Sequence, residues 1–132
     1  MKVLITDDSS TIRMMLKGLL KQLQITDVVE ASDGKDALAK VTQHKPELML
    51  LDIHMPNMDG LTCLGELKKD AATSGIPVII ISSDTVPAQL EKARELGAHA
   101  FIRKPFRVEG LREAVAAAFP SFPLPAAPGK SA

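Results

Sequence analysis

The sequence predicts an α/β fold, with one doubly wound, five-stranded parallel sheet covered by five helices. Short apolar runs recur along the chain, and several are nearly continuous, as in strands that are buried on both faces of a sheet. The segments between these runs carry apolar residues at helical spacing. This alternation repeats five times, which favours parallel strands joined by right-handed helical crossovers.

The predicted strands are the short apolar runs themselves. They cover residues 3–5, 28–29, 48–51, 78–81 and 101–102. With five strands, the commonest doubly wound arrangement is the flavodoxin-like order 2-1-3-4-5, which we therefore expect. Ligands of such sheets bind beyond the carboxyl ends of the strands, where the strand order reverses. The residues that directly follow the first, third, fourth and fifth strands are therefore the candidates for function.

The first two helices follow the first two strands. The first helix has Ser9 or Ser10 as a candidate N-cap, and Met14 and Met15 are expected to divide between core and surface. Its apolar stripe comprises Ile12, Met15, Leu16, Leu19 and Leu23. The second helix covers about residues 33–44 and ends before Pro46, because the residue before a proline disfavours the helical conformation.

The last three helices differ in how clearly the sequence marks them. The third covers about residues 59–69, and its two glycines predict the weakest helix of the five. The fourth begins near Thr85, has Pro87 in its first turn and ends at Gly97. The fifth has one apolar face, formed by Val108, Leu111, Val115 and Phe119.

Length and composition limit the class of protein. The chain has 132 residues and equal numbers of basic and acidic side chains, 16 each, which argues against binding nucleic acid or acidic lipid by bulk charge. The single cysteine, Cys63, excludes an internal disulfide and fits a reducing, cytoplasmic compartment. No apolar run approaches the ~20 residues that span a bilayer. Acids appear too early, at Asp7, for a signal peptide.

The chain divides into two parts. Residues 1–119 form the predicted folded domain, and residues 120–132, which hold four of the nine prolines, are predicted to be a flexible tail or linker. Two interpretations remain open: a protein that acts alone, as the short length favours, or a domain from a longer chain.

Charged and hydroxyl side chains stand at the ends of the predicted strands. Asp7 and Asp8 follow the first strand, Asp52 the third, Ser82 the fourth and Lys104 the fifth. A like-charge pair ~4 Å apart costs ~4 kcal/mol at an effective dielectric constant near 20, so the acids need a proton or a cation. An oxygen cluster with few protein ligands suits Mg²⁺, which is often coordinated by a phosphoryl group as well. A carboxylate nucleophile, a metal, a lysine and a hydroxyl are what phosphoryl transfer to an aspartate requires.

These strand ends resemble a known family, the receiver domain of two-component response regulators. The resemblance covers about residues 1–119 and is nearest to the single-domain, CheY-like chemotaxis regulators. It rests on four segments in the expected order. They are Ile5-Thr6-Asp7-Asp8-Ser9, Leu51-Asp52-Ile53-His54-Met55-Pro56-Asn57-Met58-Asp59-Gly60, Pro77-Val78-Ile79-Ile80-Ile81-Ser82-Ser83 and Lys104-Pro105-Phe106.

The resemblance implies a role for each site residue. Asp52 would accept a phosphoryl group from a phosphohistidine of a sensor histidine kinase or a phosphotransfer protein. Asp7, Asp8, Asp52 and the backbone carbonyl of His54 would hold Mg²⁺, and Lys104 would pair first with Asp52 and later with the phosphoryl oxygens. The bond between Lys104 and Pro105 would be cis.

The resemblance also implies a conformational switch. Ser82 would move towards the phosphoryl group, and Phe101 would change rotamer with it. The output surface for a downstream protein would comprise the fourth helix, the fifth strand and the fifth helix. The chain would then be a phosphorelay signalling switch rather than an enzyme, a monomer or weak dimer, with chemotaxis as one process it could serve.

Four positions depart from the commonest family pattern. Ser82 stands where many members have threonine, and it keeps the hydroxyl. Phe101 stands where the chemotaxis members have tyrosine, so a partner contact through a phenol hydroxyl is lost; a half-buried core position is the simpler interpretation of this residue. His54 and Asp84 each lie two residues after a site residue and are candidates for tuning dephosphorylation.

Two other classes of function compete with the switch. A Mg²⁺-dependent aspartyl phosphohydrolase would need an acid two residues after the nucleophile, where this chain has His54. A flavin or nucleotide binder on the same fold would need a glycine-rich phosphate loop after the first strand, where the two acids would repel a phosphate. Both alternatives are therefore disfavoured.

Overall fold

A computed structural model describes residues 1–83 and 86–124 of the chain. The five strands form one parallel sheet in the order β2-β1-β3-β4-β5, so the predicted fold class and strand order are confirmed. The strands are β1 (Lys2–Thr6), β2 (Asp27–Ala31), β3 (Leu48–Leu51), β4 (Val78–Ser82) and β5 (Ala100–Arg103). All residues of β3 and β4 are buried, because helices cover both faces of these central strands.

Five helices follow the strands one by one. They are α1 (Ser10–Gln22), α2 (Gly34–His44), α3 (Gly60–Lys69), α4 (Pro87–Glu95) and α5 (Val108–Ala118). Ser9, Asp33 and Asp59 cap the first three, and each side chain accepts a hydrogen bond from a backbone N–H of the first turn. The fourth helix has Pro87 in its first turn, as predicted. The start predicted near Thr85 lies outside the described residues.

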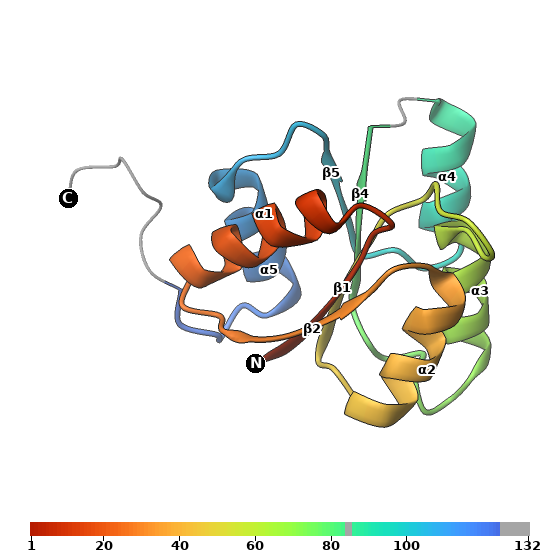
Figure 1. The fold of residues 1–132 in the computed structure, drawn as a ribbon, viewed down its shortest axis with the longest axis horizontal. Coiled ribbons are helices and arrows are strands. Elements are labelled where there is room, and N and C mark those ends of the chain that lie inside the picture. Colours follow the sequence, from red (N-terminus) through yellow and green to blue (C-terminus); the bar gives the residue numbers. More distant parts are fainter. Residues whose placement is uncertain (84–85, 125–132) are drawn as a thin grey trace.

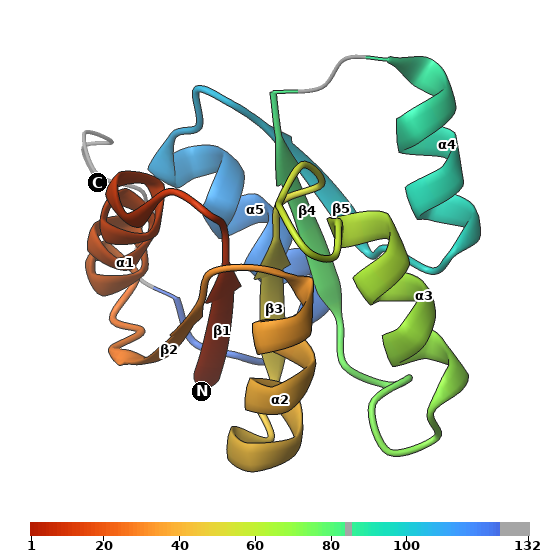
Figure 2. The same cartoon turned by 45° about the vertical axis from the view of Figure 1, so that its right-hand side comes forward.

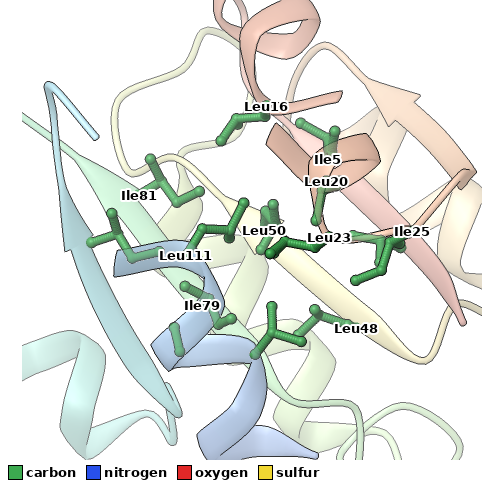
Figure 3. Close-up of a cluster of buried hydrophobic side chains, with 14 of the residues drawn as sticks. Ile5, Leu16, Leu20, Leu23, Ile25, Leu48, Leu50, Ile79, Ile81 and Leu111 are labelled. Carbon is green, nitrogen blue, oxygen red and sulfur yellow. The ribbon is translucent and has the colours of Figure 1, made fainter. Parts of the chain in front are cut away.

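The helices form two layers around the sheet (Figures 1 and 2). Helices α1 and α5 cover one face, and α2, α3 and α4 cover the other. Alternate residues of each strand therefore point into two separate cores. The first core contains Ile5, Leu50, Ile79, Ile81 and Leu111 together with Leu16 and Leu20 of α1 (Figure 3). The second contains Leu4, Met49, Leu51, Ile80 and Leu64. The two cores fix the sheet, and its carboxyl edge carries the candidate site.

Two expectations about apolar residues need correction or extension. Met15 does not belong to the core stripe of α1, because 51% of its surface is exposed, and Met14 is more exposed still, at 71%. The buried residues of α1 are Leu16 and Leu20. Beyond α5, Phe122 and Leu124 pack against the first core. Contacts with the core thus continue past residue 119, the predicted end of the domain, and that boundary stays a prediction.

Within the ranges 1–83 and 86–124, no helix combines the length and the apolar composition needed to cross a membrane.

Candidate functional site

The predicted acidic residues lie at the carboxyl edge of the sheet, next to one another. Thr6 of β1 pairs with Leu51 of β3, so the residues that follow them, Asp7 and Asp52, leave the sheet side by side. The backbone N–H of Asp52 donates to the carbonyl of Thr6 at 3.0 Å and extends this pairing by one residue. Asp7 and Asp52 are buried, at 1% and 6% exposure, whereas Asp8 is exposed. Carboxylate oxygens of all three residues lie within 4.8 Å of one another.

Lys104 reaches this cluster from the end of β5. Its ammonium donates a hydrogen bond to Oδ2 of Asp7 at 3.0 Å and lies 3.4 Å from Oδ2 of Asp52. The backbone N–H of Lys104 donates to the carbonyl of Ser82 at 3.0 Å, which holds the lysine beside the end of β4. The peptide bond between Lys104 and Pro105 is cis, as the resemblance implied. One cation therefore bridges two buried carboxylates.

The surroundings of Asp52 disfavour its ionised form. Burial raises the pKa of Asp52, and the neighbouring charge of Asp7 raises it further. Lys104 and the backbone N–H of Ile53, which donates to Asp52 at 2.9 Å, oppose this rise without cancelling it. Burial alone would lower the pKa of Lys104, but its hydrogen bond with Asp7 and the charges of both acids raise it above its ordinary value. One lysine thus does not fully offset the acidic cluster.

The donor set fits Mg²⁺. Three carboxylates supply hard oxygen ligands at a common site, and one of them, Asp8, is open to solvent and so to the water ligands that Mg²⁺ retains. The remaining electrostatic cost at Asp52 is what a cation would relieve. The donor chemistry therefore matches the predicted cofactor.

The structure places the other predicted site residues at different depths. Ser82 is buried at the end of β4, at 3% exposure, next to the β5 end that carries Lys104. His54 is exposed, two residues beyond Asp52. Phe101 is 37% exposed on edge strand β5 and lines a shallow hollow with residues of α4, so it belongs to the surface rather than to the core. Asp84 lies outside the described residues.

Gly60 packs directly against the backbone of Asp52, a contact that was not predicted from the sequence. It is the first residue of α3 and its backbone N–H donates to the carbonyl of Ile53 at 2.7 Å. A Cβ atom on Gly60 would lie 2.0 Å from the backbone oxygen of Asp52. The glycine thus lets the helix start directly against the backbone of Asp52. From the sequence, Gly60 counts as a weakness of the helix and as the last residue of the segment that begins at Leu51, and neither interpretation reports the close approach to the backbone of Asp52.

Replacement of Asp52 by asparagine should stabilise the protein at neutral pH. The pKa of Asp52 is raised in the folded state, so its ionised form costs stability above that pKa. This cost disappears as the pH falls through the raised pKa towards the ordinary value near 3.8. Urea unfolding at several pH values should give a higher free energy of unfolding for Asp52→Asn than for the parent at pH 7. This difference should shrink at acid pH.

Asp33 provides a control of opposite sign for this measurement. Hydrogen bonds from Asp36 and Asn57 lower its pKa. Asp33→Asn should therefore be less stable than the parent at pH 7, and this difference too should shrink as the pH falls. A parent that is more stable than Asp52→Asn at pH 7 would contradict the electrostatic account of the site.

The sheet order, the acidic cluster and the bridging lysine define a class of protein. Residues 3–116 match the family model of the response regulator receiver domain, and the chain belongs to this family, whose CheY-type members are signalling switches. It is 39% identical over 122 residues to protein PilG of Pseudomonas aeruginosa, covering 92% of this chain and 90% of that protein. It is 32% identical over 115 residues to the chemotaxis protein CheY of the same organism, covering 87% and 93%.

Solved structures agree with this assignment. The crystallised chemotaxis protein CheY4 of Vibrio cholerae superposes with a TM-score of 0.82 at 28% sequence identity, covering 89% of this chain and 98% of that one. The chain is thus a CheY-like receiver domain with relatives of the chemotaxis type.

Proposed function

We propose that this protein is a phospho-accepting response regulator and that Asp52 is its phosphorylation site. The observation that carries the proposal is the position of the Lys104 ammonium, 3.0 Å from Asp7 and 3.4 Å from Asp52. A fixed cation at this point can neutralise charge on a phosphoryl group that is attached to Asp52. The donor would be a phosphohistidine of a sensor histidine kinase or of a phosphotransfer protein.

The reaction transfers a phosphoryl group from nitrogen to oxygen. The P–N bond of the phosphohistidine breaks, a P–O bond to a carboxylate oxygen of Asp52 forms, and the imidazole leaves after taking a proton. Asp7, Asp8, Asp52 and the backbone carbonyl of His54 would hold Mg²⁺. When bound, this ion would offset the negative charge of the carboxylates and of the phosphoryl oxygens. Lys104 would shift its contact from Asp52 to the phosphoryl oxygens.

A downstream protein would recognise the phosphorylated state at a different surface from the acidic cluster. Ser82 lies beside the backbone of Lys104. Phe101 lies on β5, the strand that directly precedes Lys104. A movement of Ser82 towards the phosphoryl group, with a rotamer change at Phe101, would alter the surface of α4, β5 and α5. A downstream protein would bind this surface. Exposed Phe101 supports the proposal, because its side chain can turn without repacking a core.

The proposal extends to the compartment, the oligomeric state and the process in which the protein acts. We infer a cytoplasmic protein, a monomer or weak dimer, whose receiver domain covers residues 1–119 and whose residues 120–132 form a tail or linker. Its role would be signal transduction rather than catalysis, with at most slow autodephosphorylation that His54 and Asp84 would tune. The relatives named PilG and CheY support a chemotaxis-type process. A phosphohydrolase is disfavoured because exposed His54 occupies the place of the required acid.

Intact-mass measurement tests this function. The parent, incubated with Mg²⁺ and acetyl phosphate, should gain the mass of one phosphoryl group, whereas Asp52→Asn should gain none. Omission of Mg²⁺, with a chelator present, should reduce the adduct at least tenfold. An adduct that persists in Asp52→Asn, or a parent that remains unmodified by acetyl phosphate and by other small phosphodonors, would refute the proposal.

A further inference from the structure

Arg13 joins three elements next to the acidic cluster. It lies in α1, and its Nη1 donates a hydrogen bond to the backbone carbonyl oxygen of Asp7 at 2.7 Å. Its Nε pairs with Oε1 of Glu30, on β2, at 3.0 Å. The side chain is 17% exposed, so the guanidinium is largely enclosed. Figure 2 shows where the chain leaves β1 and turns back into α1, and Arg13 fixes the backbone of this turn.

The contact with Asp7 acts on the residue that follows. The carbonyl of Asp7 and the N–H of Asp8 belong to one planar peptide unit. A guanidinium that holds the carbonyl therefore sets the direction in which Asp8 leaves the backbone. The side chain of Asp7 is held separately, by the N–H of Ser9 at 2.9 Å and by Lys104 at 3.0 Å. Asp8 is exposed, so the orientation of this peptide matters most for its carboxylate.

We propose that Arg13 is a positioning residue, which orients the peptide between Asp7 and Asp8 so that the Asp8 carboxylate stays within the acidic cluster and the affinity for Mg²⁺ increases. This inference rests on the proposed function of the cluster as a Mg²⁺ site. Arg13 would touch neither the ion nor the phosphoryl group. Glu30 pairs with the guanidinium and so limits the repulsion that its positive charge would exert on a bound cation.

Lys17 provides a matched control. It lies one helical turn after Arg13 and pairs with the same carboxylate of Glu30, at 3.4 Å, but its side chain is 51% exposed. Among the described contacts, only Arg13 of these two residues bonds to the carbonyl of Asp7. Arg13→Gln and Lys17→Gln therefore remove the same charge from the same helix, and only the first removes the backbone contact.

A purely electrostatic effect and a positioning role predict opposite changes in the Mg²⁺ affinity of Arg13→Gln. Removal of a nearby positive charge would tighten Mg²⁺ binding in both variants. Loss of a residue that orients a metal ligand weakens binding, typically 10- to 100-fold. Calorimetric titration of the unphosphorylated full chain with MgCl₂ should give a Kd about tenfold higher for Arg13→Gln than for the parent. Lys17→Gln should stay within about twofold of the parent, since it lacks the backbone contact.

The possible outcomes separate this inference from the function on which it rests. A parent that binds no Mg²⁺ would overturn the proposed function itself. A parent that binds Mg²⁺, with Arg13→Gln binding equally or more tightly, would overturn only the role of Arg13. If Arg13→Gln fails to fold by circular dichroism, Arg13→Lys provides the same test, because it keeps the charge but not the two-pronged guanidinium. We expect weaker Mg²⁺ binding for Arg13→Lys as well, and an unchanged Kd would contradict the inference.

Discussion

Replacement of Lys104 by methionine should reduce the rate of phosphorylation of Asp52 about 100-fold or more. The ammonium is the positive group that the structure places between Asp7 and Asp52, and removal of one such fixed stabilising group typically costs 10²–10³ in rate. Methionine keeps most of the length and apolar volume of the lysine stem, so the change is mainly one of charge. Intact mass against time, at fixed acetyl phosphate and Mg²⁺, measures the rate.

The same replacement should lower the free energy of unfolding at pH 7 by about 2 kcal/mol, because it leaves two buried carboxylates without their cation. The loss should shrink as the pH falls, since the raised pKa of Asp52 lets that carboxyl take up a proton in the folded state first. Lys69→Met provides a surface control. Lys69 is 75% exposed and pairs with Glu66 at 3.4 Å, so its loss should cost less than ~1 kcal/mol. Equal losses in the two variants would contradict the account of the bridging lysine.

Replacement of Gly60 by alanine should be the most damaging single methyl addition next to the site. The new Cβ would meet the backbone oxygen of Asp52 at 2.0 Å, a distance that only a backbone movement can relieve. We expect a loss of about 3 kcal/mol in the free energy of unfolding, at the upper end of overpacking effects. Because the clash acts on the backbone of Asp52, the phosphorylation rate should fall as well, at temperatures where the variant is still folded.

Gly65→Ala isolates the steric effect, since it adds the same methyl group to the same helix. The nearest atom to its new Cβ would be Cδ2 of Leu96 at 3.9 Å, an ordinary contact. Alanine in a helix interior is favoured over glycine by about 0.5–1 kcal/mol, so this variant should be as stable as the parent or more stable. Urea unfolding of both variants measures the contrast. A Gly60→Ala variant as stable as Gly65→Ala would show that α3 does not start against Asp52.

The fold could be predicted because apolar pattern and chain order determine it. The runs at residues 48–51 and 78–81 became the buried central strands β3 and β4. The strand order confirmed the expectation for five alternating units. The same topology explains why Asp7, Asp52 and Lys104, far apart in sequence, were predicted to meet: parallel strands end at one edge of a sheet.

The errors and omissions arise where tertiary context decides. Met15 matches the helical spacing of the core stripe, but the surface of α1 that it occupies has no partner layer in the described chain, and it is exposed. Phe101 lies on edge strand β5, so only neighbouring helices could cover it, and they leave it partly open. Arg13 and Gly60 act through backbone atoms of other residues, Asp7 and Asp52, which lie less than ten positions away in the chain. Side-chain patterns in a sequence do not report such backbone contacts.

The position of the phosphoryl group is the most direct test of the central claim. Borohydride reduces an acyl phosphate on aspartate to homoserine, which marks the modified residue permanently. After incubation with Mg²⁺ and acetyl phosphate, reduction and peptide mass mapping should place homoserine at residue 52 alone, with Asp7 and Asp8 unchanged. Homoserine at either of those residues and not at Asp52, or no homoserine in a protein that carries the phosphoryl mass, would contradict the account.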